Sequence, residues 1–242
     1  MRALVLDDVT AAWADLGRGL PRPDAILCIS AHWYGPGIRV TAQLDPPTIH
    51  DFAGFPAELS EVQYPAMGDP ATAARVIEAL APAPAAADTS WGLDHGCWVV
   101  LVHMFPEADI PVIQLSIDAS LPPRAHLELG QRLAPLRDEG IFVLASGNVV
   151  HNLALADFSR DRPARPECER FADAITDAVI RHSHSDLVDL AQYGDDAAIS
   201  VPTPEHYLPL LYAVGASGGD AATVMTDDIE AGTLSMTSYL FG

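Results

Sequence analysis

The sequence contains no lysine, and all 13 of its basic residues are arginine. This absence excludes Schiff-base chemistry, a P-loop lysine and a lysine general base. The sequence also has no G-x-S-x-G segment, which a serine hydrolase with a nucleophile elbow would carry. No G-x-G-x-x-G segment follows a strand-like run, so a dinucleotide-binding enzyme is not indicated either.

Cysteine and long apolar runs are equally scarce. The three cysteines, Cys28, Cys97 and Cys168, are far apart and form no C-x-x-C pair. We therefore expect buried reduced thiols rather than a disulfide framework or a zinc ribbon. Asp7 and Asp8 interrupt the only early apolar run, and nowhere do eighteen apolar residues follow one another. We expect neither a signal peptide nor a membrane span, and a cytoplasmic location.

Negative charge is what the chain has in excess, with 33 acidic residues and a net charge of −20. Nucleic acids and anionic membranes bind through basic patches, so neither is expected as a partner. The hydrophobic content of 49% suffices for one full core, and no linker or charge block divides the chain. We expect a single domain over residues 1–242. The oligomeric state is not readable from the sequence.

Apolar runs alternate with amphipathic segments along most of the chain. This pattern predicts a parallel βαβ arrangement, and hence an α/β fold with a mostly parallel central sheet flanked by helices in three layers. The predicted strands are 25–30, 38–41, 110–117 and 141–146, and a closing hairpin turns at 230–232. The predicted helices include 9–17 with Thr10 as its cap, 70–80, 124–140 and 168–182, and one starting near Pro204.

Three histidines stand at the ends of these predicted elements. His32 follows strand 25–30, His151 lies in the loop after strand 141–146, and His206 lies at a helix start. Ligands of α/β sheets bind beyond the carboxyl ends of the strands, and mononuclear metal sites collect ligands from distant elements. Imidazole suits zinc, iron, copper or nickel, and the spacing does not choose among them.

Two further histidines, His50 and His95, are suited to acid–base work near neutral pH. His95 lies at a predicted helix start, where the dipole disfavours a protonated ring. His50 and Asp51 belong to the proline-, glycine- and phenylalanine-rich loop 46–56. From composition alone, this loop is equally well explained as the lining of an aromatic ligand pocket and as an ordinary surface turn.

Several longer motifs together carry a family resemblance. They are SAHW (30–33), PPTIHDFAGFP (46–56), WGLDHGCW (91–98), IPVIQLSID (110–118), LRDEGIFVLASGNVVHN (136–152) and PTPEHYLPLLYA (202–213). The sequence closely resembles the class III extradiol ring-cleavage dioxygenases of the LigB-like superfamily, in particular the 4,5-DOPA dioxygenase type. The resemblance runs over nearly the whole chain.

The resemblance implies a mononuclear non-haem iron(II), sometimes replaced by zinc in isolated protein. Matched motif by motif, His32 and His206 belong to the metal site. His151 lies at the metal as well, either as a further ligand or as the acid–base group.

The resemblance also implies that the protein cleaves a DOPA-like catechol with dioxygen, incorporating both oxygen atoms. His50, Asp51 and His95 would line the substrate pocket, and His95 and His151 would be catalytic. A neutral histidine would accept a catechol proton and later return one. The expected partners are therefore the small-molecule catechol and dioxygen.

The chain departs from the family pattern at its start. Relatives carry a metal ligand in an N-terminal His-Gly-Ser-Pro motif after a strand, and this sequence has no such motif. Aligned without gaps, Met1 falls on the methionine that follows the proline of that motif. We expect the first sheet strand and one metal ligand to be missing, which predicts weak metal binding and little activity for these 242 residues.

Two other functions remain open from the sequence. One is a zinc-dependent hydrolase, which would act without oxygen uptake. The other is a non-catalytic binding protein built on a degraded metal site. The sequence does not name the catechol, although Arg39, Arg124 or Arg160 could bind a substrate carboxylate.

Overall fold

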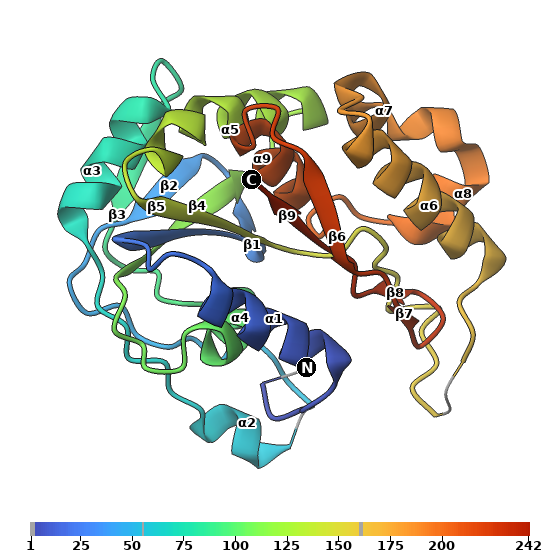
Figure 1. Ribbon diagram of the computed structural model, residues 1–242, viewed down its shortest axis with the longest axis horizontal. Helices are drawn as coiled ribbons and strands as arrows, with labels where there is room; N and C mark the ends of the chain where they lie inside the picture. The colour runs from blue at the N-terminus through green and yellow to red at the C-terminus, as the bar shows by residue number, and fades with distance from the viewer. Residues whose placement is uncertain (1–2, 55, 160–161) are drawn as a thin grey trace. The chain divides into compact units, whose positions relative to one another are not determined.

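The computed structural model describes residues 3–54, 56–159 and 162–242 (Figure 1). The chain forms two compact units. The first comprises residues 1–120 and 132–146, and the second comprises residues 121–131 and 147–242. The single catalytic domain expected over residues 1–242 stays a prediction.

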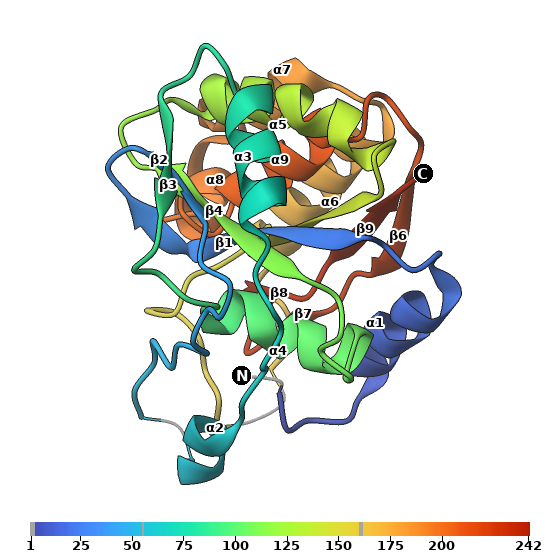
Figure 2. The same cartoon turned by 90° about the vertical axis from the view of Figure 1, so that its left-hand side faces the viewer.

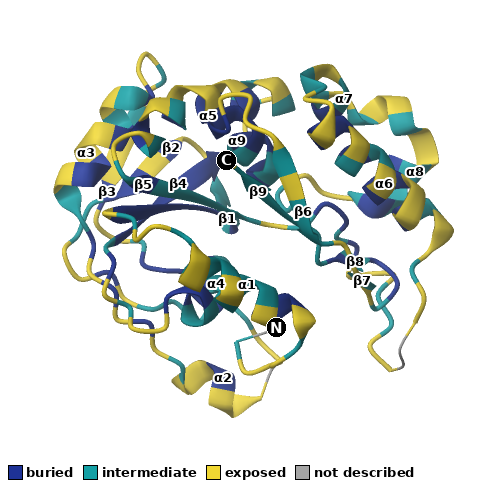
Figure 3. Cartoon of the chain, in the orientation of Figure 1, coloured by how far each residue is buried: buried dark blue, intermediate teal, exposed yellow. Residues whose placement is uncertain are grey.

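The first unit is built around a five-stranded sheet. Its strand order is β3 (Ala85–Asp88), β2 (Ile38–Thr41), β4 (Val112–Asp118), β1 (Ala25–Gly35) and β5 (Ile141–Ser146). Neighbouring strands are parallel except β2 and β4, which pair antiparallel. Strand β4 and most of β1 are buried (Figure 3). Burial on both faces explains why these strands read as continuous apolar runs, and the mostly parallel sheet is confirmed.

Helices cover both faces of this sheet. The helices that lie wholly within this unit are α1 (Asp8–Gly19), α2 (Ala57–Glu61), α3 (Pro70–Ala79) and α4 (His95–Met104), of which α3 and α4 lie against the sheet. Figures 1 and 2 show α3 on one face and α4 on the other, with α1 packed against α4. Because the sheet and α1 enclose it, α4 is apolar on nearly all sides. The two helices approach closely at Gly17, where a Cβ would lie 1.9 Å from the Met104 carbonyl oxygen.

The N-terminus of α1 corrects the expectation that Thr10 caps this helix. Asp7 is the cap, and its carboxylate accepts a hydrogen bond from the Thr10 backbone N–H at 3.0 Å. The Thr10 hydroxyl accepts one from the Asp7 N–H in return. Thr10 is therefore the third residue of the helix and the partner of Asp7 in a capping box, in the position that Glu or Gln usually holds.

The second unit is mainly helical. It contains α6 (Pro166–Ile180), α7 (His184–Val188), a 3-10 helix (Leu190–Tyr193), α8 (Gly194–Ser200) and α9 (Leu208–Ala216). Helix α5 (Pro123–Arg137) begins in this unit and ends in the first. The tail pairs β6 (Ala222–Thr226) with β9 (Ser238–Phe241), and β7 (Ile229–Glu230) with β8 (Leu234–Ser235). Ala231 and Gly232 turn the inner pair with positive φ, which confirms the closing hairpin.

The structure also tests the predictions about the cysteines and about membrane-spanning helices. Cys28, Cys97 and Cys168 are free and buried, as predicted. Across the described ranges, none of the helices has the length and apolar character needed to cross a membrane.

Candidate functional site

His32 lies within strand β1, not after its end. The sequence predicted a strand that stops at Ser30, whereas β1 continues to Gly35. The pairing is nevertheless interrupted here, because the ladder to β5 ends at Ser30 and the ladder to β4 shifts register between Ile29 and Tyr34. The His32 backbone N–H donates to the Ser30 hydroxyl at 3.2 Å instead. This irregularity leaves His32 on a stretch of β1 that the two ladders do not hold.

Asp51 lies in the loop between β2 and α2, and backbone pairing fixes the base of that loop. Thr48 and Leu93 form an isolated parallel bridge, with the Ile49 N–H donating to the Leu93 carbonyl at 2.7 Å. The Leu93 N–H donates to the Pro47 carbonyl at 2.8 Å. These bonds tie the loop to the segment directly before α4, and so bring Asp51 near His95.

His95 is the first residue of α4, as the sequence predicted. Asp94 caps this helix, with its buried carboxylate accepting from the Cys97 N–H at 3.1 Å. Gln114 on β4 in turn holds Asp94 through two hydrogen bonds of 2.8 Å, one to the carboxylate and one from the backbone N–H. The position of His95 therefore depends on a buried polar contact with the middle of the sheet.

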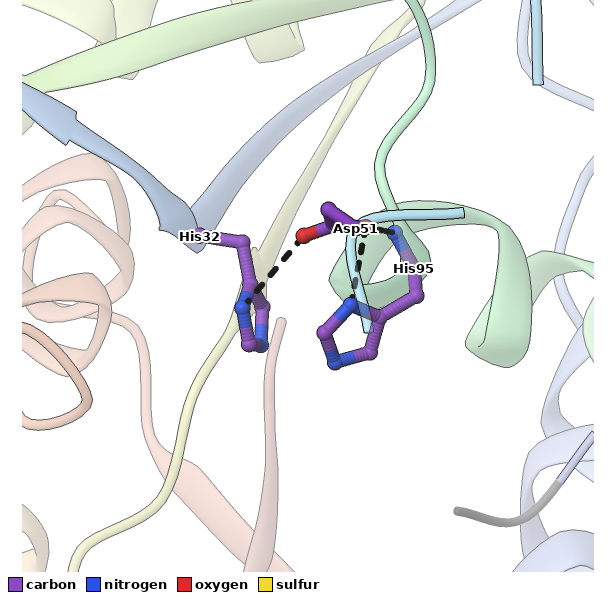
Figure 4. Close-up of side chains that lie close together, drawn as sticks. All are labelled: His32, Asp51 and His95. Atoms are coloured by element: carbon purple, nitrogen blue, oxygen red, sulfur yellow. Dashed lines mark hydrogen bonds and ion pairs between the residues drawn. The ribbon is translucent and has the colours of Figure 1, made fainter. Parts of the chain in front are cut away.

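His32, Asp51 and His95 form a compact group (Figure 4). Their ligand atoms all lie within 4.8 Å of one another, which would allow them to hold a metal ion. Asp51 Oδ1 lies 2.9 Å from His95 Nδ1, and Oδ2 lies 3.6 Å from His32 Nδ1. The two imidazole centroids are 3.7 Å apart. Gly96 permits this approach, because a Cβ there would lie 2.9 Å from His32 Cδ2.

The Asp51 carboxylate is held in its charged form. Burial alone would raise the pKa of this carboxyl group, since its side chain is only 19% exposed. The close approach of the His95 ring and a hydrogen bond from the His95 backbone N–H outweigh burial and hold the pKa of Asp51 below its usual value. A carboxylate that stays ionised beside two imidazoles is suited to orient them or to bind a cation.

Aromatic side chains surround one side of this group. Phe52 meets the rings of His50 and His95 edge to face, at centroid distances of 5.8 and 5.6 Å. His50 also lies 5.6 Å from Trp98, and its Nε2 donates to the Val62 carbonyl at 2.8 Å. The loop is thus packed through aromatic contacts at His50 and Phe52, and His50 is not one of the three residues in the compact group.

His151 and His206 lie together in the second unit. Their rings are stacked at 3.5 Å with an interplanar angle of 8°. His206 Nδ1 lies 3.2 Å from the Asn148 side-chain oxygen, and the Asn148 N–H donates to the His206 carbonyl. The prediction that Pro204 opens a helix is wrong, because α9 starts at Leu208. His206 therefore lies in the turn before α9.

The structure gives no support for substrate binding at the two candidate arginines that it describes, Arg39 and Arg124. Arg39 pairs with Asp88 at 3.2 Å, and Arg124 is exposed on α5. Arg160 lies outside the described residues. None of the described contacts assigns a substrate carboxylate to these residues.

Sequence reasoning missed Asp94 and Gln114 as supports of the site. Asp94 carried a usable signal, because Asp directly before an apolar helical run is a common cap. Gln114 was visible as an amide inside an apolar strand, and such an amide needs a buried partner. The identity of that partner depends on tertiary packing.

The donor set is chemically suited to a metal. Two imidazoles and one carboxylate are typical of non-haem iron(II) oxygenase sites, and imidazole also binds zinc. Residues from β1, from a loop and from the start of α4 supply these donors, which gives the group a rigid strand and helix on two sides.

Known proteins resemble this chain over nearly its whole length. A family model described as the catalytic LigB subunit of aromatic ring-opening dioxygenase matches residues 7–242. A protein of Escherichia coli (strain K12) named 4,5-DOPA dioxygenase extradiol is 48% identical over 244 residues, covering 98% of this chain and 90% of that protein. A Beta vulgaris protein of the same name is 38% identical over 226 residues, with coverages of 91% and 83%.

A solved structure agrees with these relatives. The crystal structure of an uncharacterized protein from Escherichia coli K12 matches with a TM-score of 0.84 and 44% identity, covering 96% of this chain and 92% of that one. With sequence and fold in agreement, the chain belongs to the LigB family of aromatic ring-opening dioxygenases and is an enzyme of the class III extradiol type.

Proposed function

We propose that this enzyme opens the ring of a DOPA-like catechol beside its diol, using dioxygen at a mononuclear non-haem iron(II). Dioxygenases of this family depend on a metal, and two relatives carry the name 4,5-DOPA dioxygenase extradiol. The observation that supports the proposal for iron is the close grouping of His32, a proposed metal ligand, with Asp51 and His95, whose polar atoms lie within 4.8 Å of one another. Zinc would bind the same donors in isolated protein.

By the motifs that contain them, His32 and His206 are the proposed metal ligands, and His151 is proposed to lie at the metal, as a further ligand or as the acid–base group. The hydrogen bond between His206 Nδ1 and Asn148 supports a ligand role, since a metal-binding histidine usually holds its other nitrogen in such a bond. A metal binds an imidazole nitrogen near the plane of the ring. Two parallel rings 3.5 Å apart are poorly placed to share one ion, which supports His206 as the ligand and His151 as the acid–base group.

The bound metal would supply a site where catechol and dioxygen meet and exchange electron density. The remaining work falls to the protein. His95 and His151 would accept a catechol proton and return one to the product. His50 and Asp51, from the loop 46–56, would line the pocket for the aromatic ring, with His95 beside them.

The test combines metal content with product identity. Protein loaded anaerobically with iron(II) is mixed with oxygen and a catechol panel that includes L-DOPA, and the product is identified by mass spectrometry. We expect a ring-opened product whose mass equals that of the substrate plus dioxygen, formed slowly in keeping with the little activity expected of these 242 residues. The His32→Ala variant should lose bound iron and product, whereas the control His184→Ala, on α7, should keep both.

Two results would contradict the proposal. A hydrolysed product without oxygen consumption would indicate a zinc-dependent hydrolase. Bound iron with no turnover of any catechol would indicate a non-catalytic binding protein.

A further inference from the structure

The Asp51 carboxylate approaches both imidazoles of the compact group, in each case at the Nδ1 atom of the ring. Its Oδ1 lies 2.9 Å from His95 Nδ1 and also accepts the His95 backbone N–H at 2.9 Å. Its Oδ2 faces His32 Nδ1 at 3.6 Å. Figure 4 shows the second nitrogen of each ring, Nε2, on the side of the ring that faces away from Asp51.

The protonation pattern follows from the chemistry of the carboxylate. An ionised carboxylate only accepts hydrogen bonds, so a nitrogen that approaches it favourably carries a proton. In a neutral imidazole with a proton on Nδ1, the lone pair lies on Nε2. Asp51 therefore favours the Nδ1–H tautomer of His95 by electrostatic attraction at 2.9 Å. It favours the same tautomer of His32 by electrostatic attraction over the longer distance.

The surroundings of Asp51 also fix its position. The backbone N–H of His95 binds the same oxygen as the ring does, so Asp51 is held against the first residue of α4. The bridge between Thr48 and Leu93 holds the loop on the other side. A metal bound directly to Asp51 would compete with these N–H groups for the carboxylate oxygens.

We propose that Asp51 is a positioning residue, not a metal ligand: it holds His32 and His95 as Nδ1–H tautomers, so that both present Nε2 to the metal and the catechol. Carboxylates that hold metal-binding histidines in this way orient the ring and raise its basicity. The statement that the Nε2 atoms face the metal and the catechol rests on the proposed function, whereas the assignment of the tautomers does not.

The first test measures the tautomers in metal-free protein. Long-range proton–nitrogen NMR on protein with ¹⁵N-labelled histidine distinguishes a protonated nitrogen from one with a lone pair, and His32→Gln and His95→Gln assign the signals. We expect Nδ1–H in both rings of the wild type. Asp51→Ala should shift both toward Nε2–H, whereas Asp15→Ala, which removes an exposed carboxylate on α1, should change neither.

The second test uses zinc(II) as a diamagnetic probe. Zinc should shift the Nε2 resonances of both rings, and Asp51→Ala should weaken zinc binding about 10- to 100-fold. An Nε2–H tautomer in the wild type, or a zinc-induced shift at Nδ1, would overturn the proposal. Wild-type protein that binds no zinc or iron would instead refute the proposed function, and the metal-free tautomers would still decide the role of Asp51. If Asp51→Ala does not fold, the tautomers of the wild-type protein alone decide the role of Asp51.

Discussion

Gln114 offers a sharp test of how the sheet supports the site. It is fully buried in the middle of β4, and its side chain meets Asp94 twice. Its oxygen accepts the Asp94 N–H and its amide nitrogen donates to the Asp94 carboxylate, each at 2.8 Å. Because Asp94 caps the helix that starts at His95, we expect Gln114→Leu to affect both stability and the position of that histidine.

The size of the effect follows from the groups left behind. Leucine has a similar volume, so the substitution leaves little cavity, but it leaves a buried N–H without its acceptor and a buried carboxylate with one donor fewer. Each such loss costs about 1–3 kcal/mol. The Trp91 indole N–H, 3.4 Å from the same carboxylate oxygen, offsets part of the second loss. We expect the free energy of unfolding to fall by about 3 kcal/mol.

Urea unfolding followed by circular dichroism measures this change. The control is Gln131→Leu at an exposed position of α5, where a change within about 0.5 kcal/mol is expected. Gln114→Glu would place a second carboxylate against Asp94, and its stability should improve as the pH is lowered, because one of the two must be protonated. A loss for Gln114→Leu no larger than that of the control would refute the reasoning.

Three further predictions concern other parts of the molecule. Gly96→Ala would place a Cβ 2.3 Å from the Ser30 hydroxyl and 2.9 Å from His32, so metal affinity, measured by titration, should fall, and unchanged affinity would contradict the packing. Burial would raise the pKa of Asp88, but hydrogen bonds from the backbone and Arg39 outweigh it and lower the pKa to about 2. Its stabilising effect is therefore present above its ordinary pKa of 3.8 and lost as the pH falls toward 2, so Asp88→Asn should cost about 1–2 kcal/mol at pH 7 in urea melts, with a difference that vanishes near pH 2. Because acidic residues outnumber basic ones by 33 to 13, raising sodium chloride from about 0.01 M to about 1 M should raise the melting temperature, and a fall would contradict dominant self-repulsion.

The sheet could be predicted from the sequence because its inner strands are buried on both faces. Runs such as 25–30 and 110–117 contain apolar residues at both parities, which is typical of parallel strands under two layers of helices. The irregularity of β1 at His32 could not be predicted in the same way. It depends on the register with β4, and register is set by the partner strand rather than by local sequence.

The compact group, like the sheet, could be predicted from the sequence only in part. His32, Asp51 and His95 were each recognisable as polar residues beside apolar elements, and each was a candidate. Their meeting depends on a backbone bridge between Thr48 and Leu93, which lie far apart in the sequence. No periodicity or spacing encodes such a contact, so the chain alone predicted the participants but not the geometry.

The most direct measurement of the central claim is the stoichiometry of oxygen uptake. An oxygen electrode and a product assay would follow iron(II)-loaded protein with L-DOPA and simpler catechols. We expect one dioxygen to be consumed for each catechol lost, with a ring-opened product and no release of hydrogen peroxide. Loss of catechol without oxygen uptake, or oxygen uptake that yields only peroxide and an intact oxidised ring, would contradict it.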